Sequence, residues 1–89
     1  VFLSADAERP AEAEAKGLAV KGSRFTYAVG RLVLYSRDAG RVDAAGRVLR
    51  TDGFEKLAIA DPKTAPYGAA AVETMRRLGL EASLRPKLV

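Results

Sequence analysis

The chain has 89 residues, with 15 Lys and Arg against 11 Asp and Glu, a formal charge of +4, no cysteine and no histidine. A chain of this length forms at most one small domain and buries only about 60 to 65% of its unfolded surface. Without Cys and His, disulfides, thiolate metal sites and the usual nucleophile and base pairs are excluded, so we expect a protein that is not an enzyme.

The first elements are a short strand and a helix. Residues 1–4, "VFLS", are apolar and predict a short buried strand. A helix is predicted from about Pro10, through "AEAEAK", to a stop at Gly17. Glu12 and Lys16 are four residues apart, in the order that favours an ion pair on a helix.

Residues 23–37, "SRFTYAVGRLVLYSR", carry the clearest strand pattern of the chain. Phe25, Tyr27 and Val29 alternate with smaller or polar residues, and a continuous apolar run follows. Gly30 divides the two halves. A glycine at such a place indicates either a bulge or a change of backbone direction.

The second half of the chain predicts another strand and a helix. Residues 38–47 are turn-rich, and residues 48–56 fit either a helical turn or a loop. Residues 57–60 predict a buried strand. The helix predicted after Pro66 has an apolar stripe formed by Ala71, Met75 and Leu78. Glu73 and Arg77 form an i, i+4 ion pair on it, and Gly79 is placed to end it. This order predicts an α/β fold with helices packed on a sheet.

The basic residues are spread along the chain with acidic residues between many of them. A nucleic-acid interface needs its Lys and Arg on one face, interleaved with aromatic residues. The scattered pattern favours a solvated surface, with weak nonspecific binding to polyanions as the alternative. We therefore expect no nucleic-acid partner. No apolar run approaches the roughly 20 residues of a membrane span.

The stretch "DPKTAPYG", residues 61–68, joins the predicted strand to the helix. No Ser, Thr, Asp or Asn stands immediately before Pro66, so the free amides of Tyr67 and Gly68 lack the usual capping side chain. Open α/β proteins bind ligands at such turns, and the helix dipole favours anions there. Gly68 also removes a side chain that would crowd a small ligand. The alternative is that water or Thr64 satisfies these amides.

Four blocks, "VFLSAD", "FTYAVGRLVLYSR", "LAIADPKTAPYGAAAVETMRRLGL" and "LRPKLV", resemble the periplasmic molybdate-binding proteins of ABC transporters, in the same order and spacing. The resemblance implies an internal piece of a two-lobed (type II) periplasmic binding-protein fold, and both ends of the chain fit a piece of a larger α/β protein. Residues 1–26 would end the first lobe and approach the hinge, 27–35 would cross the hinge, and 36–89 would form part of the second lobe. Gly30 would then give backbone freedom at the hinge.

The same resemblance implies the ligand and the partners. The ligand would be a tetrahedral oxyanion, molybdate or tungstate, with no cofactor and no directly bound metal, and the partner an ABC permease at the periplasmic face of the membrane. Tyr67 would bind through its backbone N–H, while Pro66 and Gly68 would shape the loop or contribute secondarily. Asp61 and Pro62 would shape the turn, and Lys63 would be a solvated side chain or a positive charge near the mouth.

The remaining donors of the family, serine hydroxyls and further loops, match no part of this chain, so it would hold only part of the site. One alternative stays open: the isolated chain is a non-binding structural or self-associating α/β module.

Overall fold

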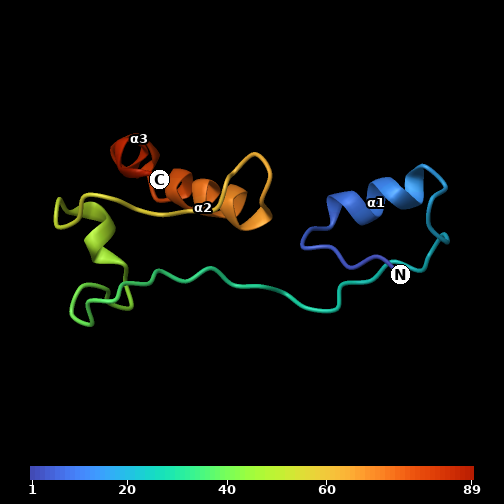
Figure 1. Cartoon of the computed structure of the whole chain (residues 1–89), viewed down its shortest axis with the longest axis horizontal. Helices are drawn as coiled ribbons and strands as arrows, with labels where there is room; N and C mark the ends of the chain where they lie inside the picture. The colour runs from blue at the N-terminus through green and yellow to red at the C-terminus, as the bar shows by residue number, and fades with distance from the viewer. The chain divides into compact units, whose positions relative to one another are not determined.

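The computed structural model describes residues 1–89, which form two compact units, Val1–Arg31 and Leu32–Val89. The elements follow one another along the chain (Figure 1). They are the α-helix α1 (Glu8–Ala15), the 3-10 helix η1 (Arg47–Arg50), the α-helices α2 (Pro66–Arg77) and α3 (Glu81–Leu84), and the 3-10 helix η2 (Arg85–Lys87). None of these helices has both the length and the apolar character that crossing a membrane requires.

Helix α1 starts two residues before the predicted Pro10, at Glu8. The carboxylate of Asp6 explains the earlier start, because its Oδ1 accepts a hydrogen bond from the amide of Arg9 at 3.0 Å. An acidic side chain just before a helix satisfies one of the free first-turn amides. The predicted pair of Glu12 with Lys16 forms, at 2.7 Å.

Helix α2 begins at the predicted Pro66 and ends beside the predicted Gly79, which has a φ of +72°. The amide of Gly79 donates to the carbonyl of Arg76 at 3.1 Å, and the amide of Leu80 donates to the carbonyl of Met75 at 2.8 Å. This is the Schellman arrangement, which needs a left-handed residue just past the helix and usually gains an apolar contact. Both Met75 and Leu80 are buried.

The chain on either side of α2 and α3 pairs in parallel. Leu57 forms a parallel bridge with Leu88. The amide of Leu57 donates to the carbonyl of Lys87 at 2.8 Å, and the amide of Val89 donates to the carbonyl of Leu57 at 3.0 Å. Parallel neighbours need a crossover connection, which α2 and α3 supply here. The second unit therefore contains one parallel bridge whose two sides are joined by a helical crossover.

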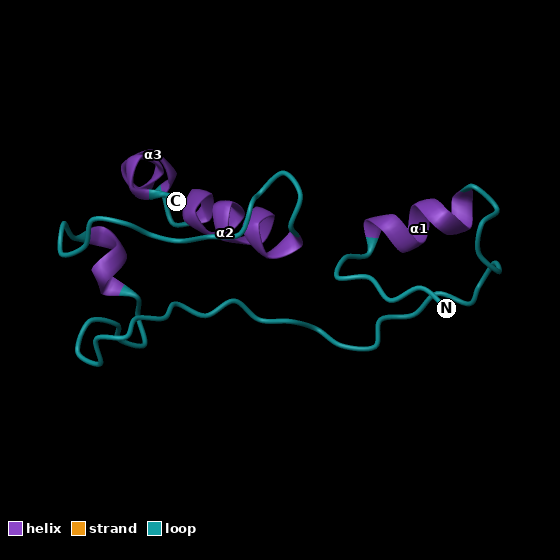
Figure 2. Cartoon of the chain, viewed as in Figure 1, coloured by secondary structure: helices purple, strands orange, loops and turns teal.

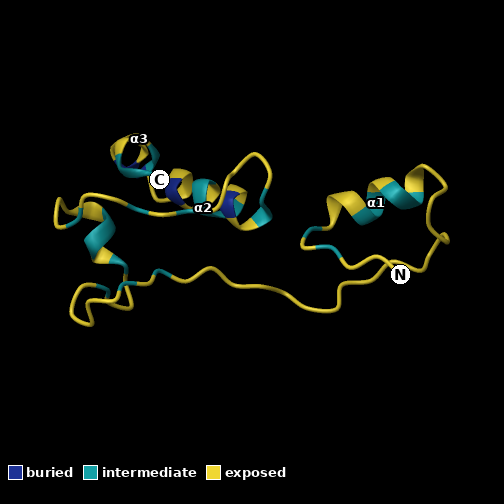
Figure 3. Cartoon of the chain, in the orientation of Figure 1, coloured by how far each residue is buried: buried dark blue, intermediate teal, exposed yellow.

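A small apolar core lies under this crossover. Its buried members are Met75, Leu80 and Leu84. The partly buried residues that pack against them are Leu49, Phe54, Leu57, Ile59, Ala71 and Leu88. Figure 3 shows the buried positions gathered on α2 and α3, whereas α1 holds none.

The apolar stripe predicted on α2 holds for Ala71 and Met75 and is wrong for Leu78, which is 44% exposed. Helix α2 ends at Arg77, so Leu78 is already the capping residue and the chain turns there. Leu80 takes the core position instead.

The predicted strands are the main difference between expectation and structure. Residues 1–4 and 23–37 contain no strand, and of residues 57–60 only Leu57 forms a bridge (Figure 2). The alternation is nevertheless visible at the bridge, where Leu57 and Ile59 are half-buried and their neighbours are exposed. A strand requires a hydrogen-bonded neighbour, and residues 24–35 have no backbone hydrogen bond.

The division into the end of one lobe, a hinge at residues 27–35 and part of a second lobe stays a prediction. Gly30, assigned to a bulge or hinge, is not among the glycines with positive φ. The stretch 48–56, open between a helical turn and a loop, begins with the last three residues of η1, and no helix continues beyond Arg50.

Candidate functional site: the loop before helix α2

Asp61 organises the turn that precedes α2. Its backbone carbonyl accepts hydrogen bonds from the amides of Ala65 at 2.8 Å and Thr64 at 3.3 Å. Its carboxylate Oδ1 accepts a third, from the amide of Lys63 at 2.9 Å. These bonds use the amides of residues 63–65 and leave the next free donors at the start of the helix. Asp61 therefore has the turn-shaping contacts that the sequence predicted.

The first turn of α2 has two amides without an acceptor in the chain. Ala65 is the extended residue before the helix, with φ −119° and ψ 126°, and no side chain caps the helix. Pro66 has no N–H, and the first helical bond runs from the amide of Ala69 to the carbonyl of Ala65, at 3.1 Å. The amides of Tyr67 and Gly68 therefore stay free, as helix geometry requires. Thr64, the alternative partner considered from the sequence, does not cap them.

Gly68 is buried and packs against the turn that precedes α2. A Cβ at this position would collide with the carbonyl oxygen of Ala60 and would lie 2.6 Å from the Ala60 carbonyl carbon and 2.7 Å from that of Asp61. The helix start thus packs directly on the backbone of the turn. The missing side chain makes room for protein backbone, and this close packing fixes where the adjacent Tyr67 amide lies.

The charges around the loop suit an anion. The first turn of α2 carries no acidic residue, and its last turn carries Arg76 and Arg77. A helix N-terminus bears a partial positive charge, which an acidic side chain would otherwise offset. The ammonium group of Lys63 is exposed and takes part in no ion pair of the chain. The carboxylate of Asp61 is the nearest negative group in sequence.

The side chain of Tyr67 is half exposed, at 53%. A role for this residue through its side chain and a role through its amide are therefore both geometrically open. No group of three or more His, Cys, Asp or Glu residues is placed to hold a metal ion.

Two hollows of the second unit lie away from this loop. One, of about 300 Å³, is lined by Arg76, Gly79, Glu81, Ala82 and Arg85. The other, of about 260 Å³, is lined by Leu49, Arg50, Thr51, Asp52, Leu80, Ser83, Leu84 and Lys87. Tyr67 and Gly68 line neither hollow.

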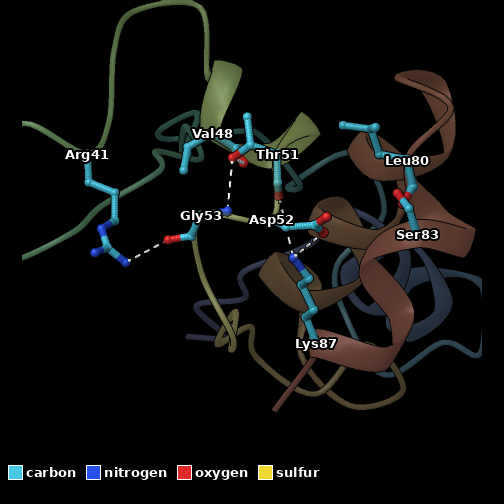
Figure 4. A network of polar contacts seen from close by, with 8 residues as sticks. All are labelled: Arg41, Val48, Thr51, Asp52, Gly53, Leu80, Ser83 and Lys87. Carbon is cyan, nitrogen blue, oxygen red and sulfur yellow. Dashed lines mark hydrogen bonds and ion pairs between the residues drawn. The ribbon is translucent and has the colours of Figure 1, made fainter.

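Figure 4 shows a polar network centred on Lys87 that was not predicted from the sequence. The Lys87 ammonium lies 3.4 Å from the carbonyl oxygen of Thr51, 3.5 Å from a carboxylate oxygen of Asp52 and 4.2 Å from the ring centre of Phe54. These partners are more than thirty positions away in the sequence, so no local spacing could have indicated them.

A second missed cluster joins α2 to α3. The Glu81 carboxylate accepts from Arg76 Nε at 3.0 Å and from Arg85 Nη2 at 2.9 Å. These two hydrogen bonds lower the pKa of Glu81 below its usual value, and the bond from Arg76 has the larger effect. The same bond raises the pKa of Arg76. The i, i+4 spacing of Glu81 and Arg85 was a signal that could have indicated half of this cluster.

Comparisons with known proteins bear on the whole chain. The family of bacterial extracellular solute-binding proteins matches residues 1–89. A protein of Rhodobacter capsulatus, described as molybdate-binding protein ModA, is 64% identical over 89 residues, which are 100% of this chain and 35% of that protein. The protein of the same description from Azotobacter vinelandii is 55% identical over the same length, again 35% of that protein.

A solved structure is also similar. The chain superimposes on the periplasmic molybdate-binding protein of Azotobacter vinelandii with a TM-score of 0.89 at 43% sequence identity, over 97% of this chain and 38% of that one. The chain therefore shares the fold of the matching part of that binding protein, and it spans about a third of the length of these relatives. The match along the entire chain, together with this shared fold, shows that the chain belongs to the family of bacterial extracellular solute-binding proteins.

Proposed function

We propose that this chain is part of the solute-binding component of a molybdate importer of the ABC type. The observation that carries the proposal is the pair of free amides at Tyr67 and Gly68, at a helix start that has neither an acidic residue nor a side-chain cap. Relatives whose names describe them as molybdate-binding support the choice of ligand. Membership of a binding-protein family supports a role without catalysis.

In this proposal the backbone N–H of Tyr67 donates a hydrogen bond to one oxygen of a tetrahedral oxyanion. Pro66 sets the direction of the helix start, and Gly68 holds it against the Ala60 backbone, so the donor is preorganised. Neutral amide dipoles at a helix N-terminus stabilise a dianion without a counter-charge. The other donors would come from parts of the protein outside these 89 residues, because the chain spans only about a third of the length of its relatives.

Tungstate has the same charge and tetrahedral shape as molybdate, so the proposal includes it as a second ligand. A periplasmic location and a permease partner follow from the same proposal, supported by the periplasmic structural relative. No cofactor, no directly bound metal and no nucleic acid take part in the proposed function.

The proposal is tested by a chimera in which these 89 residues replace the matching stretch of the Rhodobacter capsulatus relative. We expect the chimera to bind molybdate, and to bind it more tightly than sulfate, in isothermal titration calorimetry. The unmodified relative serves as the positive control, and the isolated 89-residue chain, which has only part of the site, should bind weakly or not at all. A chimera that folds, with a melting temperature near that of the relative, and still does not bind molybdate would refute the proposal.

A further inference from the structure

The turn before α2 and the first turn of the helix are held together by hydrogen bonds. The amide of Ala65 donates to the carbonyl of Asp61 at 2.8 Å, and the carbonyl of Ala65 accepts from the amide of Ala69 at 3.1 Å. The carboxylate Oδ1 of Asp61 accepts from the amide of Lys63 at 2.9 Å. A continuous series of hydrogen bonds therefore runs from Asp61, through the residue before the helix, into the helix itself.

Gly68 packs on the same turn from the helix side. A Cβ at Gly68 would collide with the carbonyl oxygen of Ala60, and it would lie 2.6 Å and 2.7 Å from the carbonyl carbons of Ala60 and Asp61. The helix start already touches the backbone of the turn, so it has no space to move closer. The hydrogen bonds to Asp61 oppose a movement away. The first turn of α2 is therefore fixed in both directions.

The residues before Ala60 are themselves held in place. The amide of Ile59 donates to the carbonyl of Val89 at 3.3 Å, and the amide of Val89 donates to the carbonyl of Leu57 at 3.0 Å. Leu57 and Ile59 also pack against the buried apolar core. Close-packed protein interiors have low compressibility and transmit displacement instead of absorbing it. The backbone on which Gly68 rests is therefore a rigid support.

A fixed helix start affects which oxyanion the site accepts. Tyr67 lies between Pro66 and Gly68, so its backbone N–H moves only with the helix start. Sulfate is a smaller tetrahedral dianion than molybdate, and a fixed donor does not follow the smaller anion inward. On the basis of the proposed function, we propose that Gly68 and Asp61 are specificity-determining positioning residues. They hold the Tyr67 amide where it favours an oxyanion of the size of molybdate over sulfate.

The ratio of two affinities separates this role from a purely structural one. A contact that only stabilises the fold affects molybdate and sulfate by the same factor, because both anions need the same folded site. A contact that fixes a donor affects molybdate more, because the fixed position matches the larger anion. We therefore use the sulfate Kd divided by the molybdate Kd, called the selectivity ratio below, as the readout.

The first test is Gly68→Ala in the chimera with the Rhodobacter capsulatus relative. The methyl group displaces the helix start from the Ala60 backbone, so we expect the molybdate Kd to rise at least about tenfold and the sulfate Kd to rise less than about threefold. Calorimetry measures molybdate, and displacement of molybdate measures sulfate, with sodium chloride at equal ionic strength to correct for screening. Gly40→Ala is the control, because nothing lies within 4 Å of a Cβ there.

A pair of Asp61 variants tests the turn without adding volume. Asp61→Asn and Asp61→Ala both remove the negative charge, and only asparagine keeps a side-chain oxygen that can accept from the Lys63 amide. We expect the selectivity ratio to be at least about threefold lower for Asp61→Ala than for Asp61→Asn, because only the alanine variant loses the hydrogen bond. Equal selectivity ratios for the two variants would overturn the positioning role of Asp61.

Failure of the specificity role and failure of the proposed function give different results. A chimera that folds and does not bind molybdate refutes the proposed function, and the specificity role falls with it. A chimera that binds molybdate, and whose Gly68→Ala variant loses affinity for both anions by the same factor, refutes only the specificity role of Gly68. Melting of each unliganded variant checks folding. If Gly68→Ala does not fold, the comparison of the two Asp61 variants decides.

Discussion

Gly68, in the first turn of α2, lies directly against the backbone carbonyl of Ala60, leaving no room for a Cβ atom. The contact links the segment whose residues 57 and 59 hydrogen-bond to residues 87 and 89 with the start of the helix that carries the free amides. The position of the proposed oxyanion donor therefore depends on the packing of Gly68 against Ala60, where any larger residue would collide with the backbone.

This contact predicts the effect of Gly68→Ala. A methyl group there must push α2 away from the Ala60 backbone, and overpacking of this kind costs about 1 to 3 kcal/mol of unfolding free energy. Urea unfolding of the 89-residue chain, followed by circular dichroism, measures it. Gly40→Ala is the matched control, because Gly40 has no positive φ and nothing lies within 4 Å of the new Cβ. A loss for Gly68→Ala no larger than for Gly40→Ala would show that the helix start adapts freely.

Glu81 predicts a pH dependence. Its pKa is lowered in the folded chain, by Arg76 first and by Arg85 next. A group with a lowered folded-state pKa stabilises above its unfolded pKa, about 4.3 for Glu, and this stabilisation is lost as the pH falls through the folded pKa. We therefore expect Glu81→Gln to lower the urea midpoint at pH 7, and the difference from the unmodified chain to shrink as the pH falls below about 4.3.

The control for Glu81 is Glu73→Gln. Glu73 makes one ion pair, with Arg77 at 2.8 Å, within α2 alone. An exposed pair of this kind contributes little to stability, so its removal should move the midpoint less than the loss of the two-sided Glu81 contacts. Equal midpoints for the two variants at pH 7 would remove the reason to assign Glu81 a role in holding α3 to α2.

Lys87 predicts a third effect. Its ammonium lies 4.2 Å from the Phe54 ring centre, and its side chain is only 19% exposed. Lys87→Met keeps the apolar stem and removes the charge, so we expect a loss of about 0.5 to 2 kcal/mol in thermal or urea unfolding, the usual range for a cation–π contact.

The fully exposed carboxylate of Asp52 supplies the comparison for Lys87. Asp52→Asn removes only a solvent-screened partner at 3.5 Å and should change the unfolding free energy by less than about 0.5 kcal/mol. A larger loss from Asp52→Asn than from Lys87→Met would mean that the ion pair, and not the aromatic ring, holds the lysine.

The sequence predicted what local chemistry determines. Pro66 and Gly79 mark both ends of α2, because a proline fits the first helical position and a left-handed residue follows the last. The free amide of Tyr67 followed from the same signals, since no capping residue precedes Pro66. The turn role of Asp61 agrees with its hydrogen bonds.

The contacts between distant residues were not predictable in this way. The reason for Gly68 depends on Ala60 lying against it, and the pairing of Leu57 with Leu88 depends on a crossover of thirty residues. Alternation at residues 25–35 indicates two faces of an extended chain, but the alternation cannot supply the neighbour that makes a strand. The missed helices α3 and η2 are too short to carry a periodic signal.

The most direct test of the central claim compares two substitutions of Tyr67 in the chimera with the Rhodobacter capsulatus relative, with molybdate affinity measured by calorimetry. Tyr67→Ala keeps the backbone N–H and should leave the affinity nearly unchanged. Tyr67→Pro removes the donor at a first-turn position that tolerates proline, and should cost about 1.5 to 3 kcal/mol, roughly 10- to 150-fold in Kd. Melting of the unliganded variants checks that both fold. Equal affinities for the two variants would contradict binding through the Tyr67 amide.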